Sequence, residues 1–225
     1  MTPFGRPCGI GACRLGIPIC EVRVLTLGIL VGEVKEDGVM VASGGRLTDG
    51  ARKILDSASE LFYRNGIHAV GVDAIAAGAG VTKRTLYDRF GSKDALVVAY
   101  LTERDRRWWE RFEERLATAP RPRVLAVFDS YRADVDEGDR GCAFINAAAE
   151  LPFSHPAYDV IRDHKQRVHE RMVQLVSEDG VADDPREVAE HLYLLLEGAV
   201  SHRGIDGSDQ RLRRAGELAE RILAG

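Results

Sequence analysis

The chain has 225 residues, of which 45% are hydrophobic, and its 31 Lys and Arg residues against 35 Asp and Glu residues give a net charge of −4. This length and composition are typical of a globular protein with one large domain or two small ones. No apolar run reaches the roughly 18 residues of a membrane span, so we exclude a membrane-spanning protein and expect a cytoplasmic one without a membrane partner.

Residues 1–47 differ from the rest of the chain, because they are rich in Gly and Val, hold three of the four cysteines and show no helical period. Two interpretations are open: a disordered or weakly β-forming arm, or an N-terminal extension that precedes a true start codon at Met40. We favour the second. The spacings of Cys8, Cys13 and Cys20 match no zinc pattern, so we expect free thiols and no bound metal.

Helical periodicity starts at Thr48 and continues nearly to the end, which predicts an all-α protein of about nine helices. Three later helices have capping residues at their starts, namely Thr82, Ser92 and Asp184, whose side chains can accept from the first turn. The expected helices are 48–65, 72–79, 82–90, 92–116, 122–135, 142–151, 156–178, 184–203 and one from 208 onward, with a loop at 137–141.

The stretch 72–90 has the pattern of a helix-turn-helix, with two short helices joined by a tight turn at Gly80. Glycine can adopt the positive φ that such a turn requires. In the second helix Leu86 and Phe90 are four residues apart and face inward. The residues left on the outer side are Lys83, Arg84, Tyr87 and Asp88. A basic N-terminal end of this kind suits entry into the major groove, although the spacing alone also fits a solvated basic face.

Positive charge is concentrated around this motif although the chain as a whole is acidic. Between Thr82 and Lys93 there are four basic residues and one acidic residue, a balance of +3 on a chain of −4. A local basic patch on an acidic body fits a protein that touches DNA at one end. It argues against a non-specific architectural DNA-binding protein, because such binding rests on widespread positive charge.

The motif lies within a run of about fifty residues that resembles the N-terminal domain of the TetR family of repressors. The matching positions are Ala58-Ser59-Glu60-Leu61-Phe62, Gly66, Val72-Asp73-Ala74-Ile75-Ala76, Ala79-Gly80-Val81-Thr82-Lys83-Arg84-Thr85-Leu86-Tyr87 and Phe90-Gly91-Ser92-Lys93-Asp94-Ala95-Leu96. The segment 141–150, GCAFINAAAE, is also similar to a C-terminal segment of one TetR subgroup, the LmrA/YxaF-like regulators.

The resemblance implies a three-helix DNA-binding domain over 48–95 and a helical ligand-binding and dimerisation domain over 96–225. It implies a homodimer, without a cofactor or enzymatic activity, that holds double-stranded operator DNA until a small-molecule effector releases it. A repressor is the favoured reading, and activation stays open.

The resemblance also assigns roles to residues of the motif. It places the N-terminal end of the recognition helix against bases and nearby phosphates, and Tyr87 and Lys93 against phosphates. At Gly71 this chain lacks the hydroxyl residue usual in the family, so only the backbone N–H can serve there. The expected DNA contacts are Gly71, Thr82, Lys83, Arg84, Thr85, Tyr87, Arg89 and Lys93.

Aromatic and polar residues between Leu96 and Val176 are candidates for lining an effector cavity. For each one the alternative is a core position or a satisfied polar group. Asn146 stands out, because a buried amide needs a partner that either a ligand or a backbone carbonyl could supply. The candidates are Trp109, Phe112, Phe128, Tyr131, Phe144, Asn146, Phe153, Tyr158 and His164.

The last two helices have long apolar faces that could form a four-helix interface between two copies of the chain. The alternative is that these faces close the core of one protomer. The resemblance favours the interface, and twofold symmetry then predicts a roughly palindromic operator. The expected interface residues are Leu192, Leu195, Leu196, Ala199, Leu212, Ala215, Ala219 and Ile222.

A helical enzyme is the main competing class. His164 and His169 are five residues apart, about 140° around a helix, so they do not share a metal-binding face. No Gly-x-Ser-x-Gly, phosphate-loop or dinucleotide motif occurs in the chain. The sequence therefore favours a regulator over an enzyme.

Overall fold

The computed structural model describes residues 47–134 and 140–224, and within these ranges the chain forms nine α-helices and no strand. The helices are α1 (Asp49–Asn65), α2 (Val72–Gly78), α3 (Lys83–Phe90), α4 (Lys93–Leu116), α5 (Leu125–Ala133), α6 (Ala143–Glu150), α7 (Ala157–Asp179), α8 (Pro185–Asp206) and α9 (Gln210–Ala224). The expected all-α fold is confirmed. The predictions made for residues 1–46 and for the loop at 137–139 lie outside the described residues.

The predicted capping side chains accept hydrogen bonds from the first turns of their helices. The hydroxyl of Ser92 accepts from the N–H of Ala95 at 3.0 Å, and the carboxylate of Asp184 accepts from two backbone N–H groups of the first turn of α8. Two boundaries differ from the prediction. The residues before α5 form a turn with bonds three residues apart, so that helix begins at Leu125, and α8 continues to Asp206, with Gly207 in the left-handed conformation as its cap.

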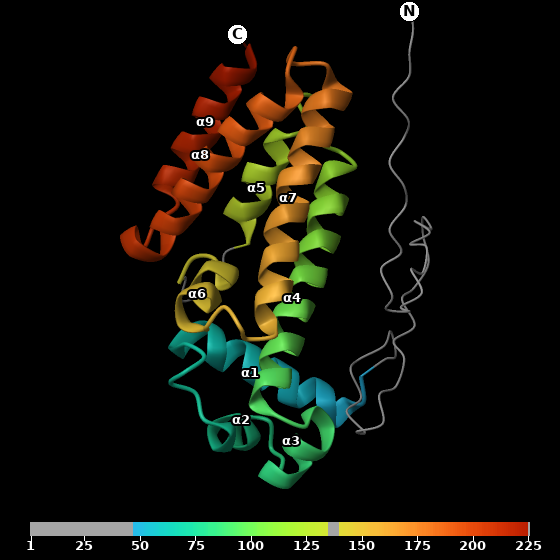
Figure 1. Cartoon of the computed structure of the whole chain (residues 1–225), viewed down its shortest axis with the longest axis vertical. Helices are drawn as coiled ribbons and strands as arrows, with labels where there is room; N and C mark the ends of the chain where they lie inside the picture. The colour runs from blue at the N-terminus through green and yellow to red at the C-terminus, as the bar shows by residue number, and fades with distance from the viewer. Residues whose placement is uncertain (1–46, 135–139, 225) are drawn as a thin grey trace, which may run out of the picture.

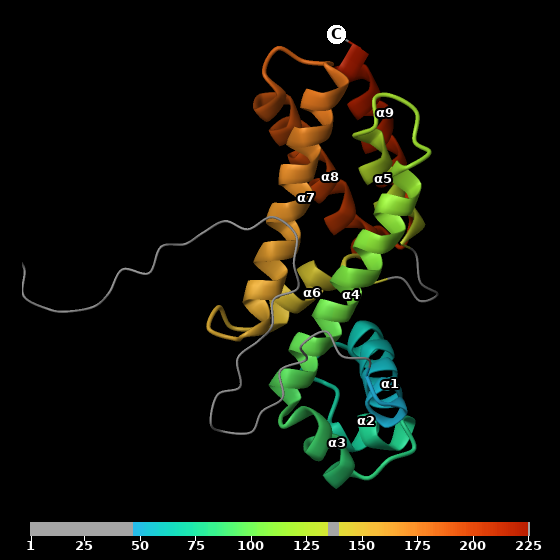
Figure 2. The same cartoon turned by 90° about the vertical axis from the view of Figure 1, so that its right-hand side faces the viewer.

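The helices are arranged as a small head and a long body (Figure 1). The head contains α1, α2 and α3. Helices α4 and α7 pack on each other and extend from the head along the body, where α5, α8 and α9 complete the packing. The short α6 lies above α1 and beside the head end of α7 (Figure 1 and Figure 2).

The apolar core is divided into two clusters that do not follow the expected boundary at residue 95. The first cluster joins the head to the start of α4 and also includes Phe144 and Ala147 of α6 and Ala157 of α7. The second fills the far half of the body. Because α6 shares its buried side chains with the head, a displacement of α6 acts directly on the packing of the head. No described helix is long and apolar enough to cross a membrane.

Candidate DNA interface and ligand cavity

The turn between α2 and α3 has the geometry that the sequence predicts. Gly80 has φ of +66°, and the N–H of the next residue, Val81, donates to the carbonyl of Ala76 at 3.0 Å. Helix α2 packs closely on α1 at Gly78, where an added Cβ would lie 2.5 Å from the hydroxyl oxygen of Ser57 on α1. Glycine at 78 therefore lets α2 pack tightly on α1, which fixes the start of α3.

Helix α3 buries one side and exposes the other. Leu86 is fully buried and Phe90 packs against the same cluster, as predicted. The hydroxyl of Thr82 accepts from the N–H of Thr85 at 3.1 Å and caps the helix. Five of the expected contact residues are exposed on or just before this helix, namely Thr82, Lys83, Arg84, Tyr87 and Arg89.

Carboxylates pair with the two exposed cations at the start of α3. Lys83 Nζ lies 3.2 Å from Asp73 Oδ2 on α2, and Arg84 Nε lies 3.9 Å from Asp88 Oδ2. Exposed pairs of this kind contribute roughly 0–1 kcal/mol, so an approaching phosphate can displace either carboxylate. The sequence pattern does not indicate the role of Asp73, because its contact with Lys83 depends on the angle between two helices.

Lys93 is less available than a surface lysine. Its ammonium donates to the carbonyl of Ile67 at 2.7 Å and lies 5.9 Å from the ring centre of Phe62. An ammonium has three protons, so a phosphate contact is compatible with this bond. Gly71 is the exposed N-cap residue of α2 and provides no side-chain cap.

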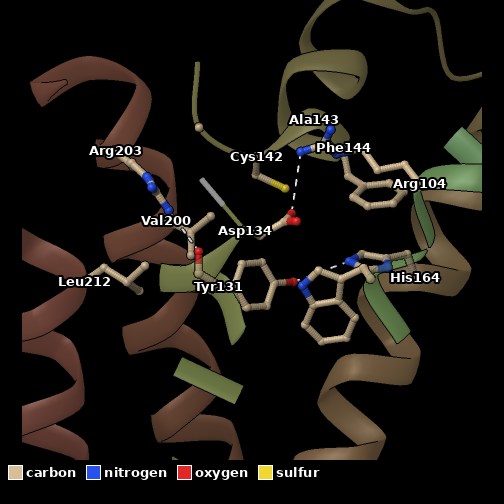
Figure 3. Close-up of a pocket in the computed structure, with 12 residues that line it drawn as sticks. Arg104, Tyr131, Asp134, Cys142, Ala143, Phe144, His164, Val200, Arg203 and Leu212 are labelled. Atoms are coloured by element: carbon tan, nitrogen blue, oxygen red, sulfur yellow. Dashed lines mark hydrogen bonds and ion pairs between the residues drawn. The ribbon is translucent and has the colours of Figure 1, made fainter. Parts of the chain in front are cut away.

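A cavity of about 20 Å³ lies in the body, lined by residues of six helices and of the chain between α5 and α6 (Figure 3). That volume is room for roughly one water molecule. The residues that enclose it are Arg104, Trp108, Tyr131, Asp134, Gly141, Cys142, Ala143, Phe144, His164, Val200, Arg203 and Leu212.

Three of the nine expected ligand residues line this cavity: Tyr131, Phe144 and His164. Phe112 and Phe128 are buried in the core and Phe153 is exposed to solvent, so none of these three aromatic residues lines the cavity. Trp109 lies under the guanidinium of Arg167, and its neighbour Trp108 lines the cavity instead. A one-residue step rotates a helical side chain by about 100°, and this rotation separates the two tryptophans.

The two polar candidates away from the cavity are satisfied by backbone carbonyls. The amide nitrogen of Asn146 donates to the carbonyl of Arg140 at 2.9 Å, which is the second of the two alternatives left open for it. The hydroxyl of Tyr158 donates to the carbonyl of Ala148 at 2.9 Å.

His164 has partners at both ring nitrogens and an aromatic ring on its face. Its Nδ1 lies 2.8 Å from Asp105 Oδ1, its Nε2 lies 3.4 Å from the hydroxyl of Tyr131, and the ring of Phe144 stacks on it with centres 3.8 Å apart. Burial lowers the pKa of His164 below its ordinary value, against the opposite effect of Asp105. The neutral ring therefore donates from Nδ1 to the carboxylate and accepts at Nε2 from Tyr131.

The charged residues around the cavity are paired within the protein. Arg104 Nη2 lies 3.5 Å from Asp134 Oδ2, and Asp134 also accepts from Arg111. Arg203 Nη1 donates to the carbonyl of Tyr131 at 2.9 Å (Figure 3). The sequence did not indicate these residues, because they come from α4, α5 and α8 and meet only in the folded chain.

The wall of the cavity is bonded directly to the head. The hydroxyl of Tyr63, near the end of α1, donates to the carbonyl of Gly141 at 3.0 Å. The carboxylate of Glu150 at the end of α6 accepts from the N–H of His68 at 2.8 Å, just after α1. Gly141 borders the cavity, so one segment contacts both the cavity and the head.

Comparison with known proteins decides the family. The family model described as bacterial regulatory proteins, tetR family, matches residues 54–100. The crystal structure of a TetR-family transcriptional regulator from Streptomyces coelicolor is similar to this chain at 31% identity, with a TM-score of 0.72, and the match covers 78% of this chain and 94% of that one. The chain belongs to the TetR family of transcriptional regulators. The resemblance seen in the sequence is thereby confirmed at the level of the family.

Curated HTH-type transcriptional regulators match part of the chain. UidR of Escherichia coli K12 is 37% identical over 62 residues, which are 28% of this chain and 32% of that protein. The activator FasR of Mycolicibacterium smegmatis is 47% identical over 60 residues, which are 26% of this chain and 27% of that protein. The chain thus spans about a third of the length of the curated relatives it matches.

The last two helices of this TetR-family chain use most of their expected interface residues inside the protomer. Six of the eight are buried in the second core cluster of the protomer, and these are Leu192, Leu196, Ala199, Leu212, Ala215 and Ala219. These six side chains therefore fill the protomer core in this structure, and the assignment to an interface stays a prediction. Leu195 is half-buried and Ile222 is exposed, so these two remain on the surface.

Proposed function

We propose that this protein is a DNA-binding transcriptional regulator, a homodimer released from a palindromic operator by a small-molecule effector. The observation that carries the proposal is the outer face of α3, where Lys83, Arg84 and Tyr87 stand exposed over a helix side anchored by Leu86. Such a helix end has the shape and charge that major-groove binding requires. A regulator that contacts chromosomal DNA acts in the cytoplasm.

We assign DNA binding to residues 48–95 and effector binding with dimerisation to residues 96–225. Within the head, Arg84 and Thr85 are the candidates for reading bases. Thr82, Lys83, Tyr87, Arg89, Lys93 and the backbone of Gly71 are assigned to phosphates. Lys93 contributes less to phosphate binding than the other cations, because its ammonium already donates to the carbonyl of Ile67, just after α1.

We assign the release of the protein from DNA to a movement of the segment that connects the cavity to the head. A ligand larger than one water must push apart the walls of a cavity of about 20 Å³. The wall formed by Gly141 and Phe144 is the one tied to the head, through the bond to Tyr63 and through the shared core. Movement of this wall would change the angle of α1, and with it the spacing of the two α3 helices in a dimer.

We place the dimer interface on the outer faces of α8 and α9, which lie side by side along one edge of the body (Figure 1). These faces have large apolar side chains in solvent, since Leu194 is 61% exposed, Ile205 75% and Ile222 42%. Large exposed apolar side chains on two packed helices are a sign of a protein–protein contact. Leu194→Glu is expected to yield monomers by light scattering, while Phe153→Glu, at a 78% exposed position between α6 and α7, leaves the mass unchanged.

The test of the proposal is a gel-shift series with the gene's own upstream region and random DNA as competitor. The proposed function requires a complex with the upstream region that survives a large excess of random DNA. Equal affinity for both DNAs would indicate a non-specific binder, and no shift at low salt would remove the assignment to DNA. A reporter fused to the bound promoter separates repression from activation.

A further inference from the structure

The indole N–H of Trp108 is a buried donor without an acceptor among the described residues. Trp108 is 3% exposed, it lines the cavity, and its Nε1 has no hydrogen-bond partner. Native proteins leave few buried donors unsatisfied, because the group loses its bond to water and gains nothing. An orphaned donor at a cavity therefore marks a place where an acceptor atom of a bound molecule would be stabilised.

The charged groups around the cavity leave little for a charged ligand. The carboxylate of Asp134 is shared by Arg104 and Arg111, and Arg203 donates to the backbone carbonyl of Tyr131. His164 donates to Asp105, which in turn pairs with Arg167 at 2.8 Å. An ionised ligand would lose its hydration on entering and would have to disrupt one of these pairs. A neutral ligand has no such penalty.

The walls of the cavity are flat rings. Phe144 and His164 stack with an interplanar angle of 10°, and the ring of Trp108 lies 5.2 Å from that of Tyr131, centre to centre. Such surfaces favour a planar aromatic molecule, which can stack on them when it opens the cavity.

We propose that the effector is a flat, uncharged aromatic molecule whose carbonyl-type oxygen accepts a hydrogen bond from Trp108 Nε1. This inference rests on the proposed function, since it names the chemical class of the effector. Aromatic stacking supplies the affinity, and the Trp108 N–H selects molecules with an acceptor over those without one.

Three naphthalenes of nearly equal shape test the proposal by calorimetry on the full chain. These probes are 2-acetylnaphthalene, a neutral ketone; 2-ethylnaphthalene, which lacks an acceptor; and 2-naphthoate, an anion. We expect the ketone to bind about tenfold more tightly than the other two, the effect of one well-placed buried hydrogen bond. Equal affinities, a preference for the carboxylate, or no binding of the ketone would overturn the proposal.

The chain contains its own matched control. Trp108→Phe keeps an aromatic ring and removes the N–H, and it should reduce the ketone preference from about tenfold to about twofold or less. Trp109→Phe makes the same change at the neighbouring ring, whose Nε1 is also unpartnered but which does not line the cavity, and it should leave the preference intact. A preference that survives Trp108→Phe contradicts the assignment. If Trp108→Phe does not fold, the three affinities of the unmodified chain still decide.

The same preparations separate this inference from the proposed function. Operator binding without any ligand is measured by gel shift on each variant. If the unmodified chain binds its operator specifically but shows no preference for the ketone, only the proposed effector class is rejected. If the unmodified chain shows no specific DNA binding, the proposed function itself is rejected.

Discussion

The hydroxyl of Tyr63 and the backbone of Gly141 form a direct bond between the DNA-binding head and the ligand cavity. The oxygen donates to the Gly141 carbonyl at 3.0 Å and accepts from the N–H of Arg140 at 3.2 Å. Gly141 has φ of +76°, and its backbone passes so close to α8 that a Cβ on Gly204 would lie 2.6 Å from the carbonyl oxygen of Arg140. The segment is thus held between α1 and α8, which makes it a sensitive point for any movement of the cavity.

Removing the Tyr63 hydroxyl should loosen the head. We expect Tyr63→Phe to lower the free energy of unfolding by about 1 kcal/mol, because two partly buried backbone groups lose their hydrogen bonds to the hydroxyl. Operator affinity should fall several-fold, since a less fixed head must be ordered on binding. Ser130→Ala is the control, because it removes a buried hydroxyl bonded to Ala126 within α5, in the far half of the body. If both variants bind operator as the unmodified chain does, the bond plays no part in positioning the head.

Arg84 is the most direct probe of base reading. Its side chain is 91% exposed and its contact with Asp88 is 3.9 Å long, so its removal should not affect the fold. Arg84→Ala should weaken operator binding by roughly 1–3 kcal/mol and relax discrimination if it reads a base. Gel shifts on operator and random DNA measure this, with Arg162→Ala on α7 as a remote control. An equal loss on both DNAs would assign Arg84 to phosphate.

The carboxylate of Asp73 should weaken DNA binding. Its exposed carboxylate lies 3.2 Å from Lys83 Nζ and competes with phosphate for that ammonium. Asp73→Asn should tighten binding to operator and to random DNA alike, by about two- to fivefold at 0.1 M salt or below, with a smaller effect as salt screens the charge. Asp159→Asn, on the distant α7, controls for net charge. A gain confined to the operator would show that the effect is not electrostatic.

The buried pair of His164 and Asp105 should make stability depend on pH. The pKa of His164 is lowered from 6.5, so the folded state binds fewer protons than the unfolded state below that pH. The free energy of unfolding therefore rises with pH in this window; the contribution is present above about pH 6.5 and is lost as the pH falls. The pKa of Asp105 lies below its ordinary 3.8, so that carboxylate stays ionised throughout.

Urea unfolding at pH 7.5, 6.5 and 5.5 measures this dependence. His164→Asn keeps an N–H that can reach Asp105 but cannot titrate, so its stability should fall less between pH 7.5 and 5.5 than that of the unmodified chain. His191→Asn, at an exposed position of α8, should retain the full dependence. Parallel pH profiles for all three chains would assign the dependence to other groups.

The features that could be predicted from the sequence are those that local chemistry controls. The caps at Ser92 and Asp184, the turn at Gly80 and the inward face of Leu86 follow from residue types and spacings within one or two turns of helix. The stability of a cap or a turn depends on residues that are close in the sequence. The pattern therefore predicted the helices of the described residues and the form of the helix-turn-helix.

The tertiary structure alone decided which faces of those helices meet. Trp108 lines the cavity and Trp109 does not, because the rotation of α4 against α5 and α7 sets which of two adjacent rings points inward. Leu192 and Ala219 fill the protomer core, while Leu194 and Ile205 remain in solvent. Helix α8 is apolar on more than one side, and periodicity identifies an apolar face without identifying its partner. That choice comes from the packing of side chains far apart in the sequence, which no local pattern encodes.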